Sequence, residues 1–154
     1  MKEKMLKIKA AIHVQKPIHD VFEAIVDPEI MSKYFIKEGS GRLEEGAVIK
    51  WQFPEFDFQF DIRVSRIKED KTISFYWADV KGPITLVEFK LSEENGSTFV
   101  RVSEKERKNS ASGIKWLKQN TEGWANFLAC LKAYLEYGIN LRQGAFSNSQ
   151  MPEV

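Results

Sequence analysis

SGIKWLKQNTEGWANFLACLKAYLEYG, residues 112–138, is the stretch that decides the fold. Its large apolar residues recur at spacings of three, four and seven, which is the period of a helix with one apolar face. The pattern predicts one long helix from about Ser112 to Arg142, ending near Gly138 or Gly144. Gly123 disfavours a helix interior by about 1 kcal/mol relative to alanine, so a kink or break is expected near it. The apolar stripe consists of Leu117, Trp124, Leu128, Leu131 and Leu135, widened by Phe127 and Tyr134.

Upstream of this stretch, apolar residues alternate with polar ones, which is the period of a strand with one buried face. Turn-forming residues separate the alternating runs, and Asn95-Gly96 is the strongest hairpin signal because both residues tolerate positive φ. Short turns of this kind predict an antiparallel meander. The expected strands lie near 41–44, 47–53, 56–67, 72–78, 84–91 and 97–106.

The first forty residues predict a strand and two short helices. Residues 6–14 alternate as a strand, which Pro17 ends, and residues 20–27 carry apolar side chains at helical spacing. Asp27 followed by Pro28 predicts the capped start of a second short helix. The fold class is therefore α+β, with a curved antiparallel sheet of about seven strands around the long helix, the only element long enough to cover the apolar face.

Composition excludes several classes of function. The 154 residues, 43% apolar, predict one domain over 1–144 with a flexible tail over 145–154. The 23 basic and 22 acidic residues are interspersed, so we expect no nucleic-acid partner. Cys130 is the only cysteine, and His13 and His19 fall on polar faces, so the sequence predicts no disulfide, metal site or other cofactor. Without a signal peptide or membrane span, we expect a cytoplasmic protein.

Three segments resemble a known family. IHVQKPIHDVFEAIVDPEIMSKYF (12–35), DIRVSRIKEDKTISFYW (61–77) and GWANFLACLKAYLEYG (123–138) are similar to the START-like, or helix-grip, superfamily that includes the birch-pollen-allergen fold and the polyketide cyclases. Within it, they resemble the activator of heat-shock-protein-90 ATPase homologue family. The resemblance implies the helix-grip fold, an interior that holds hydrophobic ligands, and a chaperone as an alternative partner.

A second short stretch, FDFQFDIRV (56–64), bears on ligand binding because it places three phenylalanines on one strand face. They fill a core or line a cavity, and we expect Phe60 to line a cavity and Phe56 to belong to the core. A strongly bent sheet encloses more volume than one helix fills, and large aromatic side chains suit the walls of such a space. The candidate ligand-binding residues are Trp51, Phe53, Phe58, Phe60, Phe75, Trp77, Phe89, Glu104, Asn120, Trp124, Phe127, Leu128 and Leu131.

Two polar residues in this set distinguish the functional hypotheses. Glu104 has the inward parity of its strand, and Asn120 lies within the helical stripe. A buried carboxylate needs a partner or a raised pKa, so Glu104 orients a ligand, lies at a wet cavity mouth, or acts as acid or base. The leading hypothesis is a non-enzymatic module, monomeric or homodimeric, that binds a small hydrophobic molecule. The alternatives are a co-chaperone-like activator of a heat-shock ATPase and a cyclase or hydrolase that uses Glu104.

Overall fold

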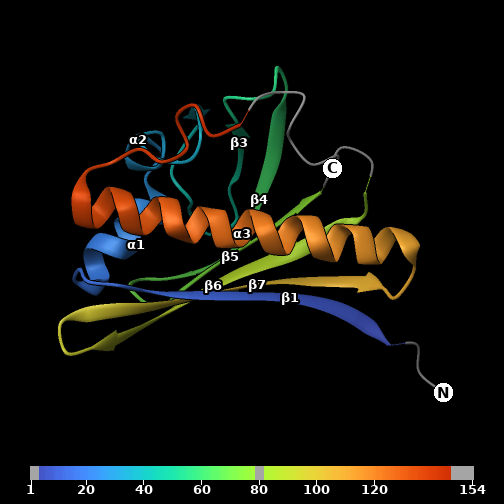
Figure 1. Cartoon of the computed structure of the whole chain (residues 1–154), viewed down its shortest axis with the longest axis horizontal. Helices are drawn as coiled ribbons and strands as arrows, with labels where there is room; N and C mark the ends of the chain where they lie inside the picture. The colour runs from blue at the N-terminus through green and yellow to red at the C-terminus, as the bar shows by residue number, and fades with distance from the viewer. Residues whose placement is uncertain (1–3, 79–81, 147–154) are drawn as a thin grey trace.

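The computed structural model describes residues 4–78 and 82–146, and they form one curved sheet with a long helix across it (Figure 1). The sheet has the antiparallel order β1-β7-β6-β5-β4-β3-β2. Its strands are β1 (Met5–Val14), β2 (Glu38–Gly39), β3 (Val48–Gln52), β4 (Gln59–Lys68), β5 (Thr72–Ala78), β6 (Ile84–Glu94) and β7 (Ser97–Lys108). The α+β class and the meander are as predicted, and β1 lies at one edge of the sheet, where it pairs with β7.

The edge of the sheet differs from the sequence prediction. Residues 41–44 form no strand, and the two-residue β2 pairs instead with the side of β3 that faces away from β4. The strand predicted from Phe56 begins at Gln59, because the chain turns after β3: the Phe56 amide donates to the Phe53 carbonyl, and the Gln52 side chain donates to the Phe56 carbonyl. The first two phenylalanines of FDFQFDIRV therefore lie in a loop, outside the alternation of β4.

The two short helices lie between β1 and β2, as predicted for the front of the chain. They are α1 (Ile18–Val26) and α2 (Pro28–Met31). Asp27 caps α2 by accepting a hydrogen bond from the Glu29 amide at 2.9 Å, and Pro28 occupies the first helical position. The second helix begins at Pro28, as the Asp27-Pro28 signal predicts, and ends at Met31.

The long helix α3 spans Ala111–Tyr137 without a break at Gly123. The Ser110 side chain caps it by accepting from the Gly113 amide at 3.1 Å. It ends at Gly138, whose φ of 68° reverses the chain in the left-handed region that glycine adopts without strain. The prediction that the helix extends to Arg142 is wrong, and residues 139–146 instead return towards the sheet, where they help to form the site described below.

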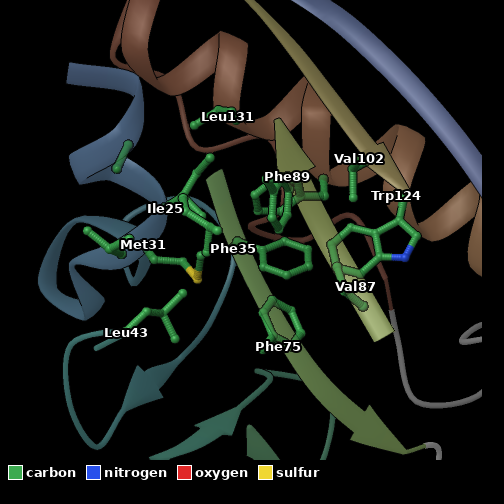
Figure 2. Close-up of a cluster of buried hydrophobic side chains, with 14 of the residues drawn as sticks. Ile25, Met31, Phe35, Leu43, Phe75, Val87, Phe89, Val102, Trp124 and Leu131 are labelled. Carbon is green, nitrogen blue, oxygen red and sulfur yellow. The ribbon is translucent and has the colours of Figure 1, made fainter. Parts of the chain in front are cut away.

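The core lies between the concave face of the sheet and α3. Figure 2 shows Phe75, Val87 and Phe89 from the strands meeting Trp124 and Leu131 from the helix, with Ile25 and Met31 closing one side. Phe75, Val87, Phe89 and Leu131 have no exposed surface. Burying one such side chain fully contributes roughly 1.5–3 kcal/mol, so this contact anchors α3 on the sheet.

Candidate functional site

Glu104 is a carboxylate buried between the sheet and α3, with 1% of its surface exposed. On β7 it follows Val100 and Val102 on the inward face, because side chains alternate along a strand. Its strand partner on β6 is Val87, two residues beyond Thr85, and Thr85 pairs directly with Trp77 on β5. The register thus brings the three side chains Glu104, Thr85 and Trp77 together across three strands.

Four neutral groups donate hydrogen bonds to this carboxylate. Oε2 accepts from Thr85 Oγ1 at 2.5 Å and from Trp77 Nε1 at 3.1 Å. Oε1 accepts from Trp124 Nε1 at 2.8 Å and from Asn120 Nδ2 at 3.1 Å. The two α3 donors are four residues apart, so they share one helix face. We call Glu104 and these four donors the Glu104 cluster.

The Glu104 cluster fixes the orientation of two indole rings. An indole Nε1–H can only donate, so each tryptophan needs an acceptor when its nitrogen is buried, and one carboxylate serves both Trp77 and Trp124. A buried carboxylate in turn needs donors to replace its hydration. The indole rings themselves lie 5.6 Å apart, centroid to centroid. The hydrogen bonds to Glu104 therefore hold the two indole rings in place, and together the rings form a rigid aromatic surface.

That surface borders a pocket of about 120 Å³, which we call the aromatic pocket. It lies between α3, the inner face of β4 and β5, and the loops after α2, β3 and α3. It opens to solvent beside Glu122 and Gly123, both exposed residues of α3. The aromatic lining comprises Phe35, Phe53, Phe56, Phe60, Trp77, Trp124 and Phe146, and the remaining lining residues are Gln119, Asn120, Glu122, Gly123, Asn126 and Arg142.

Arg142 lies at the end of this pocket where the chain returns after α3. Its Nη2 donates to Glu55 Oε1 at 2.6 Å, and both side chains are more than nine-tenths buried. The guanidinium also lies over the rings of Phe35 and Phe53, 4.7 and 5.2 Å from their centroids. This ion pair connects the chain segment after α3 to the loop between β3 and β4. Burial raises the pKa of the nearby Cys130 thiol, while Arg142 acts in the opposite direction.

The candidate ligand-binding residues divide into three groups in the structure. Those that line the aromatic pocket are Phe53, Phe60, Trp77, Asn120 and Trp124, with Glu104 behind them. Those packed in the core away from the pocket are Trp51, Phe75, Phe89, Phe127, Leu128 and Leu131, because α3 lies directly on the middle of the sheet. Phe58 is 41% exposed and stacks on Phe56 at 5.0 Å.

Sequence reasoning missed eight of the thirteen residues that line the pocket. Phe56, expected in the core, lines the pocket beside Phe60. Arg142 was expected inside the helix and Phe146 in the tail, so no pattern pointed to them. Gln119, Gly123 and Asn126 are spaced four and three apart, a helical spacing that places all three on one face of α3. That spacing was a usable signal, but the apolar stripe dominated the pattern.

Other side chains with titratable groups, Tyr34, His13 and His19, lie away from the pocket. The Tyr34 hydroxyl donates to the Ala24 carbonyl at 2.7 Å, and burial raises its pKa well above the usual value. His13 is exposed on β1, and the exposed His19 pairs with Asp70. Within the described residues, no three His, Cys, Asp or Glu side chains gather as a metal site would require. In that same part of the chain, no helix has the length and apolar character needed to cross a membrane.

Comparisons with known proteins agree with this architecture. The model of the family described as Activator of Hsp90 ATPase homolog 1-like protein matches residues 15–136. Curated proteins give no significant match. The crystal structure of the protein SSP2350 from Staphylococcus saprophyticus is 31% identical to the chain with a TM-score of 0.77, covering 89% of this chain and 96% of that one.

Two further solved structures are similar. DynU16, a protein in the dynemicin biosynthetic locus, is 27% identical with a TM-score of 0.76, covering 86% of this chain and 48% of that one. The solution structure of the Aha1 dimer from Colwellia psychrerythraea is 23% identical with a TM-score of 0.73, covering 86% of this chain and 98% of that one. The last likeness concerns the fold alone.

Proposed function

We propose that this protein, which belongs to the Activator of Hsp90 ATPase homolog 1-like family, binds a small apolar molecule in the aromatic pocket. The observation that carries the proposal is the Glu104 cluster behind the pocket wall. Two indoles held in place by one buried carboxylate cannot swing inward to fill the space without losing their hydrogen-bond acceptor. The pocket is thus preorganised, which lowers the free-energy cost of binding.

The size and lining of the pocket indicate the scale of the ligand. A volume of about 120 Å³ is close to the ~150 Å³ apolar cavity that binds benzene in another, engineered protein. One aromatic ring therefore fits without rearrangement. The rings of Phe60, Trp77 and Trp124 line the pocket and can contact the ring of such a ligand. Each contact between two aromatic rings adds about 0.5–1.5 kcal/mol beyond area burial.

The hydrogen bonds that Glu104 accepts agree better with a role in binding than with a role in catalysis. A general acid or base must reach the proton it transfers, and both carboxylate oxygens already accept two hydrogen bonds each from the protein. The carboxylate also lies behind the pocket lining instead of within it. We therefore assign Glu104 a positioning role. A turnover that Glu104→Gln abolishes while binding persists would restore the hydrolase or cyclase alternative.

The test combines a search for a retained ligand with a matched pair of variants. Native mass spectrometry and organic extraction of the purified protein should reveal a bound molecule, and titration with small aromatic probes should give saturable binding. Phe60→Leu should change probe affinity because Phe60 lines the pocket. Phe75→Leu, the same exchange in the closed core, should leave affinity unchanged in folded protein. No retained molecule and no binding across a lipid and aromatic panel would refute the proposal.

A second candidate function, stimulation of a heat-shock ATPase, is favoured by the family description itself. It requires a protein contact surface instead of a pocket, so the two functions separate experimentally. An ATPase assay with the host's own Hsp90-class chaperone should show stimulation that saturates with protein concentration. Absence of stimulation at saturating protein would remove this candidate. Light scattering in the same buffer determines whether the active species is a monomer or a homodimer.

A further inference from the structure

The lining of the aromatic pocket has two chemically different sides. The sheet and the loops supply the rings, whereas α3 supplies carboxamide side chains beside Trp124. Among these, Asn120 is engaged because its Nδ2 donates to Glu104. Gln119 and Asn126 have no hydrogen-bond partner for their side chains within residues 4–78 and 82–146. The carboxamides of Gln119 and Asn126 can therefore donate hydrogen bonds to a ligand and accept hydrogen bonds from it.

Gly123 lies between these two carboxamides. The three residues stand four and three apart on one face of α3, so the Cα atoms of Gln119 and Asn126 are about 10 Å apart along the helix axis. A glycine inside a helix lowers stability relative to alanine, and no packing reason requires it here, because an added Cβ would meet nothing within 4 Å. The missing side chain instead leaves open space at the mouth of the pocket.

The charges around this mouth disfavour an anionic guest. The charged residues that line the pocket are Glu122 and Arg142, and the Arg142 guanidinium is already paired with Glu55. The Glu104 carboxylate lies directly behind the indole wall. A ligand carboxylate would therefore lie near more negative than positive charge, in a partly desolvated site where repulsion is stronger than in water.

We propose that the ligand is an uncharged aromatic molecule with a hydrogen-bonding group, its ring in the aromatic pocket and its polar group over Gly123, between Gln119 and Asn126. The inference rests on the proposed function, since it names the ligand class for the same pocket. Gly123 acts as a specificity-determining residue: it provides the gap through which the polar group reaches solvent and the two carboxamides. A fatty acid or other carboxylate is not accommodated.

The first test compares benzamide and benzoate, two probes of nearly equal size that differ in charge, by NMR titration at pH 7. Benzamide should bind at least about tenfold more tightly than benzoate, which corresponds to the loss of one or two hydrogen bonds together with charge repulsion. Replacing Gln119 and Asn126 together by alanine should weaken benzamide binding about fivefold or more, while toluene, which has no polar group, should bind as before.

The second test blocks the gap with a matched control on the same helix. Gly123→Leu should weaken benzamide binding about tenfold or more while raising the thermal midpoint, because leucine favours a helix more than glycine does. Ala125→Leu places the same side chain on an exposed position of α3 outside the pocket lining, and binding should stay within about twofold.

The outcomes separate this inference from the proposed function. Benzoate binding as tightly as benzamide, or Gly123→Leu binding benzamide like the wild type, overturns the ligand class and the role of Gly123, while the pocket remains a binding site. No binding of benzamide, benzoate or toluene to the wild-type protein overturns this inference and counts against the proposed function as well.

Discussion

Glu104→Gln is the perturbation that tests the Glu104 cluster most sharply. Glutamine keeps the shape of glutamate but replaces one acceptor oxygen with an NH₂ donor. If the NH₂ takes the place of Oε2, it faces the Trp77 N–H, and if it takes the place of Oε1, it faces the Trp124 N–H. Either orientation leaves one indole donor without an acceptor, the partly buried one of Trp77 or the buried one of Trp124. We expect the free energy of unfolding to fall by about 1–3 kcal/mol, the cost of one orphaned buried donor.

A double-mutant cycle with Trp77→Phe isolates this cause. In the Trp77→Phe background, the glutamine oxygen can still accept from Asn120 and Trp124, while its NH₂ can donate to the Thr85 hydroxyl. Glu104→Gln should therefore lower the free energy of unfolding by a smaller amount in this background than in the wild type, with a difference of at least about 1 kcal/mol. Urea denaturation followed by circular dichroism measures all four proteins.

Trp116→Phe provides the matched control for the cycle. Trp116 is a tryptophan of the core, with 2% of its surface exposed, and its ring contacts Arg107 instead of Glu104. Its effect and that of Glu104→Gln should add to within about 0.5 kcal/mol. Glu104→Gln with wild-type stability, or equal coupling to Trp77 and Trp116, would show that the carboxylate does not hold the pocket wall.

Three further predictions concern stability. Trp124→Ala should lower the free energy of unfolding by about 3–5 kcal/mol, because it removes a large buried side chain, and a denaturation midpoint near wild type would contradict its burial. Phe60→Leu should cost less than Phe75→Leu, since Phe60 borders open space, and equal losses by urea denaturation would indicate ordinary core packing at both positions. The hydrogen bond to Asp70 raises the pKa of His19 above 6.5, so its stabilising contribution is present below pH 6.5 and is lost as pH rises through the folded-state pKa. The melting-temperature difference between wild type and His19→Gln should shrink over that range, and a difference independent of pH would refute the pairing.

The parts of the fold that follow from local periodicity could be predicted from the sequence. The alternation of β5 and β7, the Asp27 cap and the stripe of α3 each depend on neighbours a few residues away. The edge of the sheet could not be predicted in this way. Whether residues 41–44 or 38–39 pair with β3 depends on long-range register, and the late start of β4 depends on a turn that FDFQFDIRV does not reveal.

Site residues could be predicted only where a polar residue falls at a position that the sequence pattern places on the buried face of a strand or helix. Glu104 and Asn120 stood out because polar residues are costly on an inward face, and the structure brings them together at 3.1 Å. Parity also places Thr85 inward, although a lone threonine gave no reason to select it. Arg142 was out of reach, because its position depends on the chain reversal at Gly138 and on a partner 87 residues away.

The most direct measurement of ligand binding uses the four tryptophans of the chain as built-in reporters. Each indole N–H gives its own signal in a ¹H–¹⁵N spectrum; Trp77 and Trp124 line the aromatic pocket, whereas Trp51 and Trp116 do not. During titration with benzamide, the Trp77 and Trp124 signals should shift together and saturate, while the Trp116 signal stays in place and the Trp51 signal moves less. No saturable shift at Trp77 and Trp124, or equal shifts at all four indoles, would contradict binding in this pocket.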